Sequence, residues 1–151
     1  VGTDDALDLL GTAAITQGKL AYQLAMTAFS GSRWDALEER GAKLQRPLWA
    51  STSTKNPDYP DTYYVDSLIG PNTVNTMPEA TLEAFDDHGN LVSTLDASPE
   101  ADQKRWEQLG ELVDLDEVSA KLEAEGVASF ATSFDEVLAT LAERVGPSVD
   151  G

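Results

Sequence analysis

Only two stretches of this 151-residue chain have the composition of β-strands, and that shortage constrains the fold more than any other feature. One is the apolar run at 46–51, Arg-Pro-Leu-Trp-Ala-Ser, and the other is the β-branched run at 73–77, Thr-Val-Asn-Thr-Met. A helical pattern at 61–68 separates them, which predicts two parallel strands joined by a right-handed crossover. Two parallel strands do not form a stable sheet alone, because other elements must cover the faces and edges of a parallel sheet. Either the strands are misread and the domain is helical, or residues outside this chain complete the sheet, and we favour the second.

Helical patterns fill most of the remaining sequence. The first is expected at 3–29 with Thr3 or Asp4 as its cap, and the next is capped by Ser32 and ends near Gly41. Four more helices are expected after the second strand: from Pro78 towards His88, around Trp106 and Leu109, from Leu115 to Glu125 with Gly126 as its stop, and from a Ser133–Glu136 capping box to Gly146.

Acidic residues greatly outnumber basic ones, with 27 Asp+Glu against 10 Lys+Arg and a formal net charge of −17. A negative field opposes binding to nucleic-acid phosphates and to anionic membrane surfaces, so we expect neither as a partner. The sequence has no cysteine, which excludes thiol catalysis and cysteine-ligated metals. It also has no pattern of a membrane span or a signal peptide, so we expect a cytoplasmic protein with a single domain.

Polar side chains follow both predicted strands. The loop at 51–56, Ser-Thr-Ser-Thr-Lys-Asn, offers four hydroxyls, an amide and one cation, and Asn75 and Thr76 close the second strand in the equivalent place. Working residues of βα barrels lie at the carboxyl ends of the strands. The loop therefore suits a phosphate monoester, with Lys55 as the point charge. The alternative is that such a cluster before Pro57 is ordinary turn composition.

Other candidate residues favour structural roles. His88 is the only histidine and is expected near a helix C-terminus, where it would interact with the helix dipole. Asp86 and Asp87 are adjacent and cannot point the same way on a helix, so a solvated face is favoured over a metal site. Trp34, Trp49 and Trp106 are read as packing residues, and no Ser-His-Asp set, P-loop or dinucleotide motif is present.

Three segments resemble transaldolases, in particular the longer bacterial form typical of actinobacteria. They are RPLWASTSTKNP at 46–57, YYVD at 63–66 and TVNTMPEATLEAF at 73–85, and the resemblance extends over most of the chain. It implies an α/β fold, the C-terminal part of a (β/α)₈ TIM barrel, with the two strands as its seventh and eighth. Residues 1–45 would be helices before strand seven, residues 46–90 strand seven to the helix after strand eight, and residues 91–151 a C-terminal helical segment. A complete barrel takes about 250 residues, so a chain of 151 residues can supply only part of one.

The resemblance also implies an activity. Transaldolases of the pentose phosphate pathway move a dihydroxyacetone unit between sugar phosphates through a lysine Schiff base, with neither a metal nor an organic cofactor. The implied substrates are fructose 6-phosphate, sedoheptulose 7-phosphate, erythrose 4-phosphate and glyceraldehyde 3-phosphate. The alternative from another class is a non-enzymatic helical module whose acidic surface meets a basic protein.

Three residues of this chain match the family's phosphate loop. Lys55, followed by Asn56, stands where the family commonly has an arginine followed by asparagine, with two extra residues in the loop, and Ser51 matches the serine of that motif. Lysine keeps the charge but loses the bidentate geometry. The Schiff-base lysine belongs to a motif resembling Val-Lys-Ile-Pro, which none of the five lysines matches. We therefore expect no catalytic residue here, no activity from this chain alone, and an N-terminal part of the same enzyme as its partner.

Overall fold

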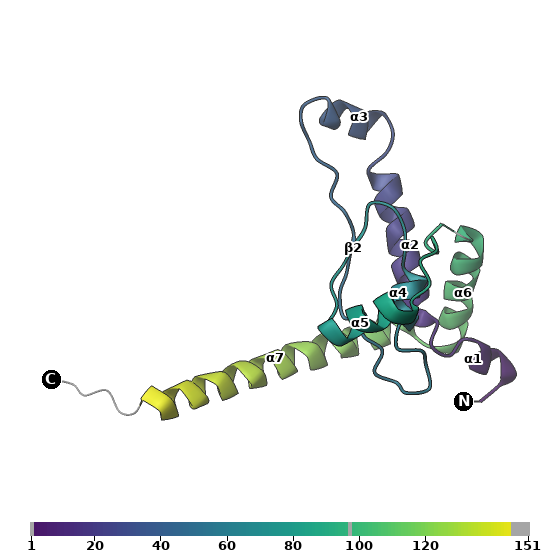
Figure 1. Cartoon of the computed structure of the whole chain (residues 1–151). Helices are drawn as coiled ribbons and strands as arrows, with labels where there is room; N and C mark the ends of the chain where they lie inside the picture. Colours follow the sequence, from purple (N-terminus) through teal and green to yellow (C-terminus); the bar gives the residue numbers. More distant parts are fainter. Residues whose placement is uncertain (1, 97, 146–151) are drawn as a thin grey trace. The chain divides into compact units, whose positions relative to one another are not determined.

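The computed structural model describes residues 2–96 and 98–145, and helices dominate this part of the chain (Figure 1). The chain divides into two compact units, Val1–Leu109 and Gly110–Gly151. The elements follow in the order α1 (Asp4–Asp8), α2 (Ala13–Ala28), α3 (Ser32–Glu38), β1 (Leu48–Trp49), α4 (Tyr63–Ser67), β2 (Val74–Asn75), α5 (Glu79–His88), α6 (Pro99–Leu112) and α7 (Leu115–Val145).

The two predicted strands are present and pair in parallel, with α4 between them in the chain. Leu48 lies opposite Val74 and Trp49 opposite Asn75. The Val74 amide donates to the Pro47 carbonyl and the Thr76 amide to the Trp49 carbonyl, each at 2.9 Å. Each strand has two residues, fewer than the runs of five and six predicted, because the pairing ends where the loops turn away. Within the described residues the sheet stops at these two strands.

The N-terminal helix is broken, and the prediction of one helix over 3–29 is wrong. The chain turns between α1 and α2, where Gly11 has a φ of +76°. A Cβ atom at Gly11 would lie 2.9 Å from the ring of Tyr59, so this turn accommodates a side chain from the loop after β1. Thr3 does cap α1, because its hydroxyl oxygen accepts from the Ala6 amide at 3.4 Å.

Two other predicted helix starts are displaced by one residue. Gly31, with a φ of +79°, occupies the cap position before α3, so Ser32 is the first helical residue rather than the cap. Pro78 likewise stands at the cap position, and α5 begins at Glu79. The predicted end of α5 at His88 is confirmed.

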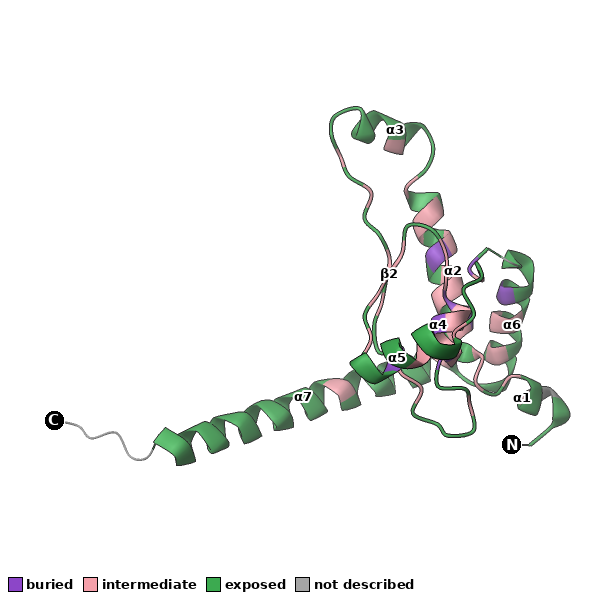
Figure 2. Cartoon of the chain, viewed as in Figure 1, coloured by how far each residue is buried: buried purple, intermediate pink, exposed green. Residues whose placement is uncertain are grey.

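A small apolar core lies among α2, α4 and the segment before α6. Tyr22, Leu68 and Leu95 are its buried members, and Leu95 is completely enclosed. Figure 2 shows that buried positions are few and that most of the described chain is exposed or half-buried. The amides of Thr94 and Leu95 donate to the Ile69 carbonyl at 2.8 and 3.1 Å, which fixes this segment against the end of α4. Trp49 of β1 packs against the same core.

The second unit consists mainly of α7, one uninterrupted helix over Leu115–Val145. Asp114 caps it by accepting from the amides of Asp116 and Glu117 at 3.1 and 3.0 Å. The prediction of two helices separated at Gly126 is wrong, because glycine in a helix interior costs only about 1 kcal/mol and long helical runs flank it. The predicted stop at Gly146 lies outside the described residues. None of the described helices combines the length and apolar character that crossing a membrane requires.

Candidate functional site

The carboxyl ends of the two strands are joined by side-chain hydrogen bonds. Thr52 is 3% exposed, and its hydroxyl donates to Asn75 Oδ1 at 2.8 Å, with a longer contact of 3.4 Å to the Thr76 carbonyl. Ser51, one residue earlier, has a φ of +59°, which is uncommon for a residue with a side chain. The polar residues after both strands therefore meet, as their positions in the sequence predicted.

The loop after β1 is also held at its far end. The Thr54 hydroxyl donates to the backbone carbonyl of Asp61 at 3.1 Å, which closes the segment that carries Lys55. Asn56 Oδ1 accepts from the Asp58 amide at 3.0 Å and forms a local turn. The Tyr59 ring stacks on Tyr63 of α4 with centroids 5.2 Å apart. These contacts restrict the positions open to Lys55.

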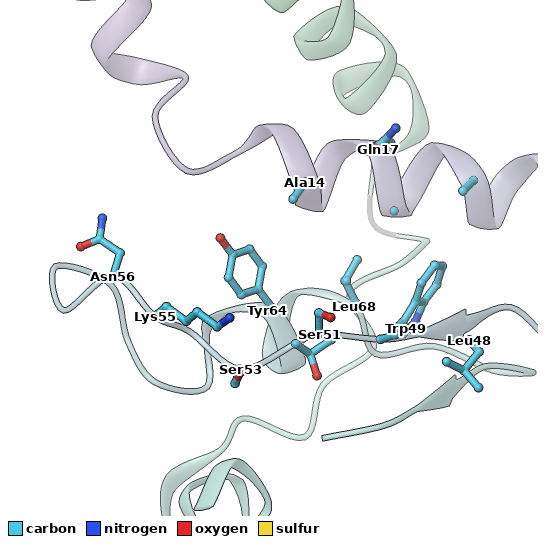
Figure 3. Close-up of a pocket in the computed structure, with 14 residues that line it drawn as sticks. Ala14, Gln17, Leu48, Trp49, Ser51, Ser53, Lys55, Asn56, Tyr64 and Leu68 are labelled. Carbon is cyan, nitrogen blue, oxygen red and sulfur yellow. The ribbon is translucent and has the colours of Figure 1, made fainter. Parts of the chain in front are cut away.

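A cavity of about 780 Å³ lies between α2, β1 with its loop, and α4. Lys55, Ser51 and Ser53 all line it, and Figure 3 shows the Lys55 side chain extending along the loop towards the two serines. Asn56 also lines the cavity, but its side chain points away from the other three (Figure 3). The structure thus brings Lys55 and Ser51 together and leaves Asn56 at the edge of the group.

A second hollow of about 350 Å³ lies between the loop after β1 and the segment after β2. Ser51, Ser53 and Lys55 line one side, and Thr76, Met77 and Pro78 line the other. Pro78 precedes α5, whose first amides have no acceptor within the helix and carry the positive end of its dipole. The Glu79 carboxylate in the first turn of α5 opposes an anion there. The arrangement places one cation, hydroxyls and a helix N-terminus around the same space.

Two of the four hydroxyls in the loop at 51–56 form hydrogen bonds that stabilise the fold. Thr52 and Thr54 donate to protein oxygens, whereas the hydroxyls of Ser51 and Ser53 have no partner among the described residues. Lys55 is exposed, and no carboxylate in the described ranges forms an ion pair with it. It is the only cation lining either hollow within the described chain. An uncompensated cation beside two serine hydroxyls can bind an anionic oxygen group.

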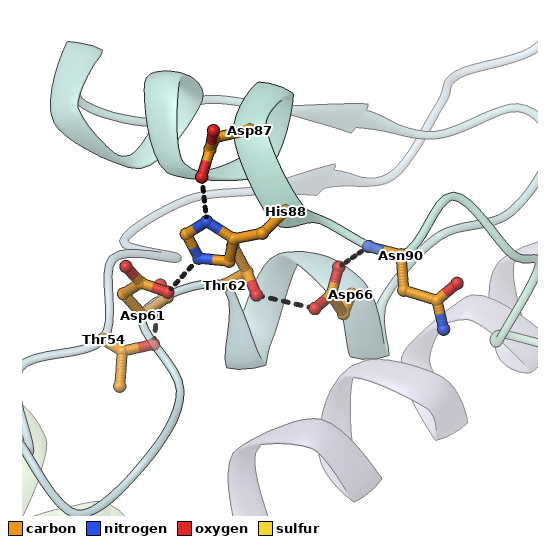
Figure 4. A network of polar contacts seen from close by, with 7 residues as sticks. All are labelled: Thr54, Asp61, Thr62, Asp66, Asp87, His88 and Asn90. Atoms are coloured by element: carbon orange, nitrogen blue, oxygen red, sulfur yellow. Dashed lines mark hydrogen bonds and ion pairs between the residues drawn. The ribbon is translucent and has the colours of Figure 1, made fainter.

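Sequence reasoning missed a polar network beside this loop, which Figure 4 shows. His88 Nε2 lies 2.8 Å from Asp61 Oδ1, and His88 Nδ1 lies 3.0 Å from Asp87 Oδ2. The hydrogen bond to Asp61, followed by that to Asp87, raises the pKa of His88, and the same His88 contact lowers the pKa of the Asp61 carboxyl. The sequence placed His88 correctly at a helix end but could not show a partner 27 residues away.

Asp66 of α4 completes the network. Its Oδ2 accepts from the Thr62 hydroxyl at 2.7 Å, and its Oδ1 accepts from the Asn90 amide at 2.9 Å. These bonds attach the segment after α5 to α4. Within the described ranges, no group of three or more His, Asp or Glu side chains is arranged so that it could hold a metal ion.

Two parallel strands, a helical crossover and polar loops meeting at the strand ends define an α/β protein. The family model described as "Transaldolase/Fructose-6-phosphate aldolase" matches residues 4–141, so the chain belongs to this family. A transaldolase of Frankia alni is 48% identical, over 98% of this chain and 40% of that protein. One of a Parafrankia strain is 50% identical, over 97% and 40%, and one of Mycolicibacterium smegmatis 45%, over 91% and 38%.

The chain therefore spans about two fifths of the length of these curated relatives. The predicted family is confirmed by the match. The paired strands and the family match argue against the alternative, the acidic helical interaction module, which has no need of paired strands.

Proposed function

We propose that this chain is the C-terminal part of a transaldolase barrel, with β1 and β2 as its seventh and eighth strands. Residues 1–45 then precede strand seven, residues 46–90 carry both strands and their loops, and residues 91–151 form the C-terminal helical segment. The chain's share of its relatives, about two fifths, supports this assignment. The remaining part of the enzyme would supply the other six strands and the Schiff-base lysine.

The exposed surface of β1 supports the proposal that a segment outside this chain lies against this strand. Leu48 is a strand residue, yet it is 52% exposed. A further strand at this edge would cover Leu48.

We propose that the complete enzyme, in the cytoplasm, transfers dihydroxyacetone units of the pentose phosphate pathway. Its substrates would be fructose 6-phosphate, sedoheptulose 7-phosphate, erythrose 4-phosphate and glyceraldehyde 3-phosphate. This chain contributes Lys55 and Ser51 as direct contacts to the substrate phosphate, while Asn56 acts mainly by forming the turn beside Lys55. The observation that carries this role is the uncompensated Lys55 beside the serine hydroxyls at the strand ends.

A chimeric enzyme tests the assignment. The segment of the Frankia alni transaldolase that precedes its matched region is joined to this chain, and glyceraldehyde 3-phosphate release from fructose 6-phosphate and erythrose 4-phosphate is measured. We expect activity from the chimera and none from this chain alone. A chimera that is folded by circular dichroism and monodisperse, yet inactive, contradicts the proposal. If the fused chain does not fold, the two segments are coexpressed and assayed as separate chains.

The phosphate role is tested by Lys55→Ala in the chimeric enzyme. A hydrogen bond to a charged group contributes about 1.5–3 kcal/mol, so we expect KM for sugar phosphates to rise about tenfold or more. The kcat should change less, since the cation contacts the ground state and the transition state alike. Lys55→Arg keeps the charge and serves as the matched control. An unchanged KM in the alanine variant would refute the phosphate role and leave the family assignment intact.

A further inference from the structure

The His88 ring connects the C-terminal end of α5 to the residue that closes the Lys55 loop. Its two nitrogens lie 2.8 Å from Asp61 Oδ1 and 3.0 Å from Asp87 Oδ2 (Figure 4). A neutral imidazole carries one N–H and can donate to only one of these carboxylates. The imidazolium carries two N–H groups and donates to both. The geometry therefore fits the charged form of His88.

Asp61 connects His88 to the loop. Its carboxylate faces His88, and its backbone carbonyl accepts from the Thr54 hydroxyl at 3.1 Å. Thr54 directly precedes Lys55, so the same residue that pairs with His88 also closes the segment from which the Lys55 side chain extends. A change in the position of Asp61 would be passed to the backbone beside Lys55.

The charged groups that face His88 come from two elements and are all acidic. Asp87 belongs to α5, and Asp61 precedes α4. Asp66 on α4 is engaged by the Thr62 hydroxyl and the Asn90 amide. In the described ranges, neither Asp61 nor Asp87 has a lysine or arginine as an ion-pair partner. His88 is thus the cation available to hold Asp61, and its raised pKa extends its charged range upward in pH.

We propose that His88 is a positioning residue for the substrate phosphate site, holding Asp61 and through it the Thr54–Lys55 segment in the binding arrangement when the imidazole is protonated. The proposal rests on the assigned phosphate role of Lys55. Nothing requires His88 to touch the substrate. Its expected effect is therefore on KM and its pH dependence, while kcat stays close to that of the unchanged enzyme.

The test compares KM for fructose 6-phosphate in the chimeric enzyme and its His88→Gln variant across the titration of His88. An exposed ion pair contributes little, so we expect KM of the variant to exceed that of the parent by about two- to fivefold at low pH. The ratio should fall as pH rises through the His88 pKa, because the neutral ring can donate to only one of the two carboxylates. The substrate phosphate titrates near pH 6, but it does so equally in both enzymes and cancels in the ratio.

The His88 pKa is read independently from the imidazole C–H resonance, assigned as the signal absent from the His88→Gln spectrum. The midpoint of the KM ratio should coincide with that pKa. His88→Arg keeps a cation at every pH and can still face both carboxylates, so it should retain the low KM without the pH dependence. If the ring had a purely structural role, the midpoint of the KM ratio would not match the His88 pKa, and His88→Arg would not retain the low KM.

A double-mutant cycle tests whether His88 acts on the Lys55 loop through Asp61. Asp61→Asn removes the carboxylate but keeps the carbonyl that holds Thr54, so it should raise KM as His88→Gln does, and the double variant should be no worse than either single variant. Asp86→Asn, the same charge change at an exposed site on α5, is the matched control and should leave KM unchanged. Additive effects of Asp61→Asn and His88→Gln, or a KM ratio that is constant with pH, would overturn the positioning role. If Lys55→Ala leaves KM unchanged, the phosphate assignment itself has failed.

Discussion

Replacing Thr52 with valine removes the hydroxyl that joins the loop after β1 to the end of β2. Valine has nearly the same shape, so the substitution leaves no cavity at a residue that is 3% exposed. What it does leave is Asn75 Oδ1 without the donor that now lies 2.8 Å away. The contact of Thr52 with the Thr76 carbonyl, at 3.4 Å, is too long to add much.

The expected cost follows from burial. An acceptor left unpaired in the interior costs about 1–3 kcal/mol, and because Asn75 is only half-buried, water can partly replace the lost bond. We therefore expect Thr52→Val to lower the free energy of unfolding by about 1–2 kcal/mol. Replacing both partners removes the unpaired group altogether. The double variant Thr52→Val, Asn75→Leu should thus lose less stability than the two single variants added together.

Urea unfolding of the chimeric enzyme measures these changes, provided that the dependence of the free energy on urea concentration stays constant among the variants. Amide exchange at Val74 and Thr76, whose N–H groups pair the two strands, gives a local reading of the same effect. The reasoning predicts a coupling energy of at least about 0.5 kcal/mol between Thr52 and Asn75. Strictly additive losses, with unchanged exchange at both amides, would refute it.

Three further substitutions test the packing. Leu95→Ala should destabilise the protein by about 2–5 kcal/mol, because Leu95 is fully enclosed. A Cβ at Gly70 would approach Leu95 Cδ1 to 2.6 Å and Leu95 Cβ to 2.9 Å, so Gly70→Ala alone should also destabilise the protein, and unchanged stability in unfolding measurements would contradict this packing. Gly126→Ala should stabilise α7 by about 0.5–1 kcal/mol, since a Cβ there meets nothing among the described residues. A loss of stability instead would indicate that another segment covers Gly126 in the assembled protein.

The parallel strand pair and its crossover were predictable because composition and order along the chain carry that information. Apolar and β-branched runs on either side of a helical pattern leave few alternatives once right-handed crossovers are the rule. Strand length was not predictable. It depends on where a loop leaves the sheet, and here Ser51, the last residue of the run that contains β1, turns away with a φ of +59°.

The two mispredicted helices show why glycine is ambiguous in a sequence. Gly11 interrupts a helical pattern because the Tyr59 ring, 48 residues further on, occupies the space beside it. Gly126 sits within an equally helical pattern and leaves α7 continuous. Glycine permits both outcomes at a cost of about 1 kcal/mol, so contacts that are remote in the sequence decide between them.

The candidate site was predictable to the same degree. Ser51, Lys55 and Asn56 lie within six positions, and a local cluster after a strand is visible in the sequence. That Thr52 and Thr54 serve the fold could not be foreseen, because their partners lie at Asn75 and Asp61. The contact between His88 and Asp61 was hidden for the same reason.

The contacts that hold the Lys55 loop are all made within the first unit of this chain. The loop is fixed at one end by Thr52 and Asn75, at the other by Thr54 and Asp61, and Asp61 is held by His88. None of these bonds depends on the strands that we propose to be missing. The phosphate half of the site would therefore be preorganised before the rest of the barrel assembles, and binding the substrate phosphate would cost little further ordering of the loop. Chemistry at the Schiff-base lysine would then depend on the missing part, and phosphate affinity on this one.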